Sequence, residues 1–418
     1  MDKSGNRDNA ANSGSRTSNW NNGPTNSNWN IGLRAACDDK FTRNGRSRPP
    51  LQTQLHCCGR PCHPLRQIHN GVKRAWSSET SKHALASSSS FTTKGPMGQK
   101  YRNLIAQIAT TDNLYAAYRK ATKGKRYTAG HLAFKQHLAA NIGMLRDALL
   151  DGSYRPSEPR KFMVYEPKPR QISALPFADR VVQHALCNII EPIFEKTFLP
   201  NSHACRTGRG THTAVVAAQA HMRQGHTWVL QMDFAKFFAS VDRKTLHAEI
   251  ERKVSCRATL ALIAHIVPAT GTGLPIGNLT SQLFANVYGH IWDRFITHKI
   301  KLSAWIRYMD DTVIFARSRE ALAVIQHGLG WFAGQTLKMT FSKWSIRKCT
   351  TGLPWLGYRV WPTHKLLLRA SVIRAKQKLA KYRGASMAGQ RQRFIAAWHG
   401  HARWANSFNL LNRIGVFA

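Results

Sequence analysis

Apolar residues recur at regular spacing only from about residue 97 onward. From Tyr101 they return every three or four positions, the spacing of one helical face, and residues 97–150 are predicted to be helical. Residues 1–96 are instead rich in Asn, Ser, Gly, Thr and Arg and show no sustained helical or strand period. This first stretch is therefore expected to be a disordered extension that precedes the folded part.

Strand patterns occur at three places in the folded part. Residues 161–166 and 171–174 flank a Pro-rich turn, which predicts a hairpin. Residues 228–234 form a short apolar strand, and residues 305–315 predict a strand, a turn and a second strand. The other periodic segments predict helices at 179–194, 243–253, 320–332, 371–382 and 389–405, and a turn followed by a long apolar helix at 273–293.

Composition adds a nucleic-acid partner to this picture. The chain has 418 residues, 43% of them apolar, and a formal net charge of +40 at pH 7. This length suffices for several subdomains, and the charge far exceeds what solubility needs, which implies a polyanion bound through its phosphates. The sequence shows no run of about 18 apolar residues and no apolar signal peptide, so we expect a cytoplasmic protein with no membrane role.

The cysteines fall into two groups. Those near the start are Cys37, Cys57, Cys58 and Cys62, and the later ones are Cys187, Cys205, Cys256 and Cys349. Single cysteines with apolar flanks are typical of reduced core residues. The early cluster includes His56 and His63 but lacks a second ligand pair at zinc-finger spacing, so a zinc site is not expected there.

Three aspartates stand in apolar strand contexts that favour metal chemistry. Asp233 is the next-to-last residue of the strand at 228–234, and Asp310 and Asp311 lie in the predicted turn within 305–315. Carboxylates beside apolar flanks are costly unless a cation compensates them, and Mg²⁺ prefers such ligands. Two Mg²⁺ ions held in this way assist in-line phosphoryl transfer. An isolated Asp-Asp pair is more often a solvated turn, but a second acidic strand argues for a shared site.

The residues around these aspartates resemble reverse transcriptases. Tyr308-Met309-Asp310-Asp311, with apolar residues after it, resembles their catalytic hairpin. Asp233 and the following Phe234-Ala235-Lys236-Phe237-Phe238 resemble the first catalytic motif of the bacterial, group II intron-like branch. The resemblance implies an α+β right-hand polymerase, an RNA-directed DNA polymerase with fingers and palm at 97–362 and a helical thumb at 363–418. The palm is expected to hold an antiparallel sheet and helices.

The resemblance also implies roles for individual residues. Asp233, Asp310 and Asp311 would be catalytic and, together with Phe234, would bind two Mg²⁺ ions, with Mn²⁺ as a substitute. The residues implied for binding of the incoming dNTP are Lys168, Arg170, Phe234, Ala235 and Phe238, the last as a steric gate against the ribose 2′-hydroxyl. Lys343 is either a general acid for the leaving pyrophosphate or a solvated surface lysine. Leu356, Gly357 and Tyr358 match the primer grip.

One motif narrows the branch further. Where most relatives have Gln-Gly, three residues and Ser-Pro, this chain has Ile276-Gly277-Asn278-Leu279-Thr280-Ser281-Gln282. Ile in place of Gln and Gln in place of Pro resemble the reverse transcriptases of diversity-generating retroelements. That resemblance implies copying of a template-repeat RNA into cDNA with errors opposite adenine, and mutagenic retrohoming. Ile276, Gly277, Ser281 and Gln282 are the implied fidelity and template residues.

The same resemblance implies a bacterial or phage origin and a homopentameric accessory variability protein as partner. Other interpretations stay open: a retron or group II intron-type enzyme, or a non-catalytic RNA-binding scaffold. Within the extension, residues 12–34 resemble the end of a lectin-like variable domain that these retroelements diversify. Residues 1–96 are therefore expected to be translated template repeat and spacer, with a working start at Met97, or else a basic tail that holds RNA.

Overall fold

A four-stranded antiparallel sheet carries the acidic strands. The computed structural model describes residues 99–165 and 169–414, and in it the strand order is β4-β5-β3-β6. The strands are β3 (Trp228–Phe234), β4 (Trp305–Tyr308), β5 (Asp311–Ala316) and β6 (Phe341–Lys348). Because β3 lies between β5 and β6, the strand that carries Asp233 is paired on both sides.

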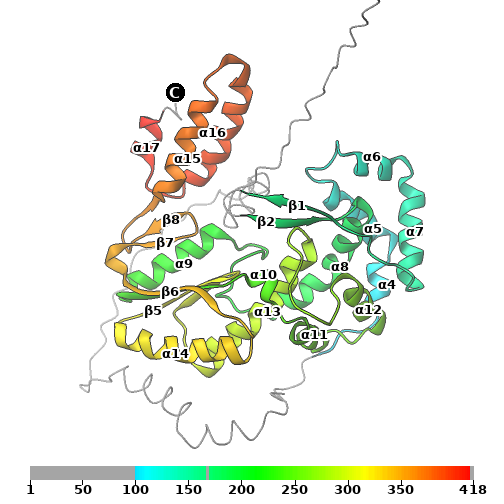
Figure 1. The fold of residues 1–418 in the computed structure, drawn as a ribbon, viewed down its shortest axis with the longest axis horizontal. Helices are drawn as coiled ribbons and strands as arrows, with labels where there is room; N and C mark the ends of the chain where they lie inside the picture. Colours follow the sequence, from blue (N-terminus) through cyan, green and yellow to red (C-terminus); the bar gives the residue numbers. More distant parts are fainter. Residues whose placement is uncertain (1–98, 166–168, 415–418) are drawn as a thin grey trace, which may run out of the picture.

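Helices cover both faces of this sheet (Figure 1). On one face, Thr312 of β5 accepts a 3.2 Å hydrogen bond from the indole of Trp292 in α13 (Leu279–Arg294). Helix α14 (Arg319–Gln335) packs on β3, β5 and β6. On the other face, Thr211 of α9 (Thr211–Arg223) donates a 3.2 Å hydrogen bond to the Tyr308 hydroxyl. The strands β3, β4 and β5 are therefore buried on both faces, whereas the edge strand β6 is partly exposed.

A mostly helical part that contains one hairpin precedes the sheet. Its elements are α4 (Leu104–Ile108), α5 (Thr111–Thr122), α6 (Ala129–Gln136), α7 (Leu138–Leu150), β1 (Arg160–Val164), β2 (Arg170–Ala174) and α8 (Phe177–Glu195). Helix α8 is the central one, since it packs against both α5 and α13. Further elements of the central part are α10 (Phe237–Ser240), α11 (Arg243–Glu251), α12 (Arg257–Ile266) and the π-helical turn η1 (Phe295–Lys299).

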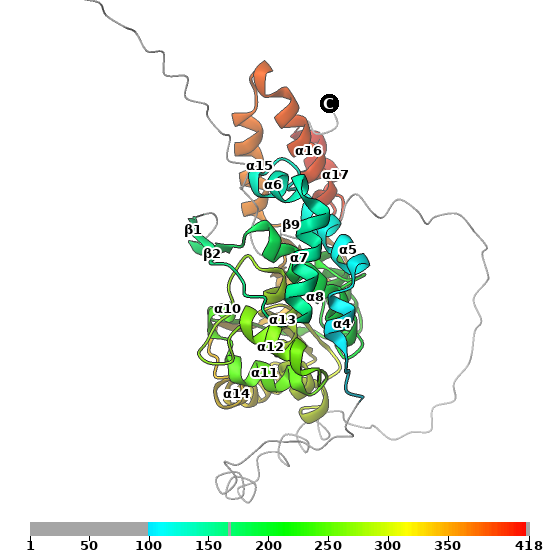
Figure 2. The same cartoon turned by 90° about the vertical axis from the view of Figure 1, so that its right-hand side faces the viewer.

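A small sheet connects the central part to a C-terminal helical arm. Strands β7 (Leu353–Trp355), β8 (Tyr358–Val360) and β9 (Lys365–Leu367) form it, with 3-10 turn η2 (Cys349–Thr351) before them. The arm consists of α15 (Arg369–Lys381), η3 (Ala385–Met387), α16 (Ala388–Ala402) and α17 (Phe408–Arg413). Figure 2 shows the arm standing above the rest of the molecule. The expected division at residue 362 stays a prediction, and it would fall between the paired strands β8 and β9.

This architecture confirms the expected α+β right-hand fold. We call α4–α8 with β1–β2 the fingers, the four-stranded sheet with α9–α14 the palm, and α15–α17 the thumb. The predicted strands and helices are present with ends that shift by a few residues. The elements that were not predicted are α9, α10, α12, α17, β6 and β7–β9. The four described cysteines are free, as expected. Residues 1–96, with their cysteine cluster, and Lys168 lie outside the described residues.

No helix among residues 99–165 and 169–414 is long and apolar enough to cross a membrane.

Candidate active site

Strand pairing brings the three predicted catalytic aspartates to one end of the palm sheet. Asp233 and Asp311 are register partners across β3 and β5, so their side chains leave the same face of the sheet. Tyr308 of β4 pairs with Asp311 of β5, so the turn between the two strands consists of Met309 and Asp310. The backbone amide of Phe234 closes the group by donating a 3.3 Å hydrogen bond to the Asp310 carbonyl.

The turn itself is strained. Met309, its first residue, has a φ of 57°, in the left-handed region that a residue with a side chain enters at a cost of about 1 kcal/mol. Strained backbone persists only where the surrounding structure determines it, and such positions gather at functional sites. The strain therefore agrees with a functional role for the Asp310 turn.

Electrostatics at this strand end favour a bound cation. The pKa of Asp310 is raised to about 6, mainly by burial and in second place by the nearby carboxylate of Asp233. The positive charges of Arg170 and Arg307 act in the opposite direction on the same pKa. Two carboxylates that repel each other in a partly buried place are stabilised in their charged forms by a metal ion.

The donor set fits Mg²⁺ that is shared with a substrate. Among the described residues no group of three or more Asp, Glu, His or Cys side chains closes a metal site by itself. Mg²⁺ in nucleotide enzymes is bound by one or two carboxylates together with substrate phosphates, which this strand end could provide. Phe234, the further predicted metal position, stacks its ring on Phe341 at 4.7 Å, so only its backbone could contribute.

A β-bulge adds a residue that sequence reasoning missed. The register of β3 with β6 shifts between Asp233 and Phe234, which leaves Ser342 as the extra residue of β6. The Ser342 hydroxyl donates a 2.5 Å hydrogen bond to the Asp233 carboxylate. Bulges beside active sites often re-aim side chains, and this one orients a predicted metal ligand. Its only sequence signal was its place beside Lys343.

Of the predicted nucleotide-binding residues, some lie in the fingers and others in the palm. Arg170 begins β2 and is near enough to Asp310 for its positive charge to oppose the rise in that pKa. Phe238 is half-buried on α10 and packs edge-on against Phe237. The amide of Ala235 donates a 2.8 Å hydrogen bond to the Thr340 carbonyl, so a phosphate contact by this amide would require that bond to break.

The Ile276-Gly277 loop is fixed to the fingers hairpin. The amide of Ser173 in β2 donates a 2.8 Å hydrogen bond to the Ile276 carbonyl. Gly277 has a φ of 113°, and a Cβ there would lie 2.9 Å from the Ser173 carbonyl oxygen. A side chain is thus excluded at this position for two reasons, strain and contact.

Behind this loop, α13 begins with polar side chains that the protein leaves unpaired. The side-chain oxygens of Asn278, Thr280 and Ser281 are buried and have no hydrogen-bond partner among the described residues. Gln282 is half-buried on the next position. Buried polar atoms are normally paired, and the unpaired oxygens at a helix start indicate a place for a polar ligand or water.

The remaining predicted residues lie farther from the turn or face inward. Lys343 is exposed and is the register partner of Asp233 across β6, which leaves both of its interpretations open. Leu356 and Gly357 form the two-residue turn between β7 and β8, with φ values of 50° and 89°. Tyr358 is fully buried, and its hydroxyl lies 2.8 Å from Nδ1 of His401, so its ring packs against the thumb; the primer-grip role of the three residues stays a prediction.

Similarity to known proteins agrees with this geometry. Residues 160–360 match the family model described as reverse transcriptase (RNA-dependent DNA polymerase). The chain is 26% identical to protein YkfC of Escherichia coli over 53% of this chain and 72% of that protein. It is 29% identical to the group II intron-encoded protein LtrA of Lactococcus lactis, over 37% of this chain and only 28% of LtrA.

The fold is also similar to that of apo telomerase from Candida tropicalis, with a TM-score of 0.42, 8% identity, and coverage of 62% of this chain and 59% of that one. The family match spans the hairpin β1–β2, all four palm strands and β7–β8. Residues 160–360 thus form a domain that matches the reverse transcriptase family, and this part of the chain is homologous to the proteins that group II introns encode.

Proposed function

We propose that this protein copies RNA into DNA at the end of the palm sheet where Asp233, Asp310 and Asp311 meet. The observation that carries this proposal is the register pair of Asp233 and Asp311, with Asp310 in the adjoining turn. Their carboxylates would hold Mg²⁺, which when bound activates the primer 3′-hydroxyl and stabilises the leaving pyrophosphate. Ser342 keeps the Asp233 carboxylate oriented for this purpose.

The side chains around the aspartates orient the nucleotide. Arg170 binds the triphosphate through its planar fork, and Lys168 assists as a point charge. Phe238 excludes a ribose 2′-hydroxyl by its bulk, so that deoxynucleotides are selected. The basic thumb helices α15 and α16 contact the phosphates of the template and product duplex.

We further propose that the template is the repeat RNA of a diversity-generating retroelement, copied with errors opposite adenine. Ile276 supports this, because its carbonyl is tied to β2 while its side chain can neither donate nor accept a hydrogen bond. A Gln at this place could fix the geometry of the nascent base pair. Losing one such contact is worth about 1 to 3 kcal/mol, which lowers discrimination roughly tenfold or more.

Primer extension on an RNA template with Mg²⁺ and dNTPs tests the polymerase function, and sequencing of the products tests the error pattern. Errors concentrated opposite template adenine support the retroelement assignment. Uniformly accurate products favour the second candidate, a group II intron-type or retron enzyme, which the similarity to LtrA also supports. RNA binding without synthesis would instead favour a scaffold. If the protein is a retroelement enzyme, a homopentameric accessory protein is the expected partner, and it should co-purify with the enzyme.

A further inference from the structure

Arg307 is a fully buried charge, and only Tyr308 separates it from the Met309–Asp310 turn. It lies in β4, on the sheet face that packs against α13, and has an exposed fraction of 0%. An arginine keeps its proton in proteins, so this charge has to be compensated inside the core. The sequence offered one signal, a basic residue in an otherwise apolar strand, but not the identity of its partners.

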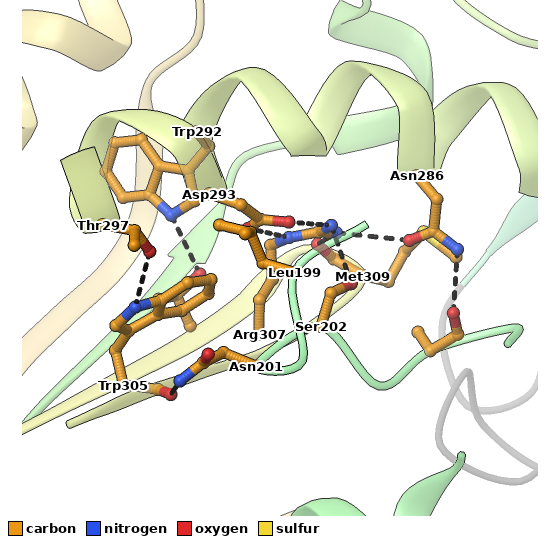
Figure 3. A network of polar contacts seen from close by, with 12 residues as sticks. Leu199, Asn201, Ser202, Asn286, Trp292, Asp293, Thr297, Trp305, Arg307 and Met309 are labelled. Atoms are coloured by element: carbon orange, nitrogen blue, oxygen red, sulfur yellow. Dashed lines mark hydrogen bonds and ion pairs between the residues drawn. The ribbon is translucent and has the colours of Figure 1, made fainter. Parts of the chain in front are cut away.

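Helix α13 supplies most of the compensation (Figure 3). Nε and Nη2 of Arg307 donate to the two carboxylate oxygens of Asp293, each at 2.7 Å. Nη2 also donates to the Ser202 hydroxyl at 2.9 Å, and Nη1 donates to the side-chain carbonyl of Asn286 at 3.4 Å. Four of the five N–H groups of the guanidinium are thereby engaged.

The remaining N–H group reaches the turn. Nη1 of Arg307 donates a 3.0 Å hydrogen bond to the backbone carbonyl of Met309, the residue in the left-handed conformation. The peptide that contains this carbonyl links Met309 to Asp310. The guanidinium therefore fixes the plane of the peptide that precedes a predicted catalytic carboxylate.

The shape of α13 matches this arrangement. Asn286, Gly289 and Asp293 are spaced as i, i+3 and i+7, so they share one helix face. A Cβ added at Gly289 would lie 2.6 Å from Nη1 of Arg307. The glycine thus leaves the space that the guanidinium occupies between its two polar partners.

We propose that Arg307 is a positioning residue for catalysis: held by Asp293, Asn286 and the space at Gly289, it sets the Met309–Asp310 peptide in its active orientation. This role rests on the proposed polymerase function. Stability alone does not account for the pair, because buried ion pairs can often be replaced by apolar residues without loss of stability. The bond to the Met309 carbonyl is what such a replacement would remove.

The first test replaces both charges. The double variant Arg307→Met with Asp293→Leu is expected to keep a Tm close to that of the wild type. Hydrogen exchange in the peptide that contains the turn should be at least about tenfold faster, because the carbonyl clamp is gone. DNA synthesis should fall roughly a hundredfold, as a displaced catalytic group predicts. A double variant that is stable and synthesises DNA at the wild-type rate would overturn the proposal.

The second test leaves every polar group in place. Gly289→Ala should displace the guanidinium and give the same faster exchange at the turn, whereas Gly334→Ala, where an added Cβ meets no atom within 4 Å, should change neither exchange nor synthesis. Wild-type exchange at the turn in Gly289→Ala would contradict the proposal. Because exchange is measured without substrate, it still tests Arg307 if the wild-type protein fails to polymerise, an outcome that would count against the proposed function alone.

Discussion

Asp233 and Asp311 face each other as register partners of β3 and β5, and each stands at the end of its apolar strand. This pairing predicts that either Asp233→Asn or Asp310→Asn reduces DNA synthesis to less than about 1% of wild type, because a neutral amide binds Mg²⁺ far more weakly than a carboxylate does. Primer extension measures the loss, and circular dichroism checks the fold. Asp147→Asn, on an exposed surface, is the control. Substantial synthesis by either site variant would remove that residue from the catalytic group.

The bulge residue Ser342 is expected to support catalysis without being essential. Ser342→Ala removes the hydrogen bond to the Asp233 carboxylate, and a bond to a charged but accessible group predicts a loss of kcat of about threefold to tenfold. Steady-state kinetics on an RNA template would measure it. Ser303→Ala, in an exposed loop, should leave kcat unchanged. Equal kcat values for the two variants would mean that Asp233 needs no such orientation.

Ile276 is expected to set the error frequency. Ile276→Gln should lower misincorporation opposite template adenine, with a smaller effect on total synthesis, because Gln restores a hydrogen-bonding side chain at the loop next to β2. Sequencing of products from a defined RNA template measures the error at each base. Ile276→Leu keeps an apolar side chain and should retain the wild-type pattern. An adenine error frequency that is the same in the Gln variant would exclude Ile276 from the fidelity mechanism.

Acid should destabilise the palm through buried neutral histidines. Burial, together with the smaller effects of the Arg209 and Arg206 charges, lowers the pKa of His203 to about 4. With an unfolded pKa of about 6.5, the neutral form is favoured on folding, so this contribution is complete above pH 6.5 and is lost as the pH falls toward 4. The loss amounts to at most about 3 kcal/mol.

Urea titrations between pH 7 and 4 would measure this loss as a fall in the free energy of unfolding. His203→Asn keeps a donor for the hydroxyl of Thr213 but cannot titrate, and its stability should depend less steeply on pH. Parallel curves for the two proteins would show that His203 contributes nothing to the acid sensitivity.

Residues 1–96 are expected to be dispensable for synthesis. A protein that starts at Met97 should extend primers on a separately supplied RNA at the full-length rate, if the first part is translated template repeat and spacer. Filter binding at increasing salt would show whether the basic extension adds RNA affinity. A large loss of both activity and RNA affinity on truncation would favour the basic-tail interpretation instead.

Sequence patterns predict the palm well wherever burial shapes the strand. The predicted strand at 228–234 coincides with β3, because this strand is paired on both sides and buried on both faces. Strand β6 was missed, since Phe341–Lys348 is an edge strand that mixes apolar, polar and basic residues without alternation. Arg307 and Asp293 could not be paired from the sequence, because the pairing depends on how α13 crosses the sheet. Helix propensity and strand alternation carry no information about that crossing.

Helix α13 starts beside the Ile276-Gly277 loop and reaches Asp293 about 20 Å farther along its axis. One helix therefore connects the loop of Ile276, the residue expected to govern accuracy, with Asp293, which holds the Arg307 guanidinium. A substitution in α13 would therefore affect two properties at once. If selection changed the error frequency through this helix, the rate of synthesis would change as well. Accuracy and speed would then evolve as linked traits in this enzyme, and separating them would require changes outside this helix.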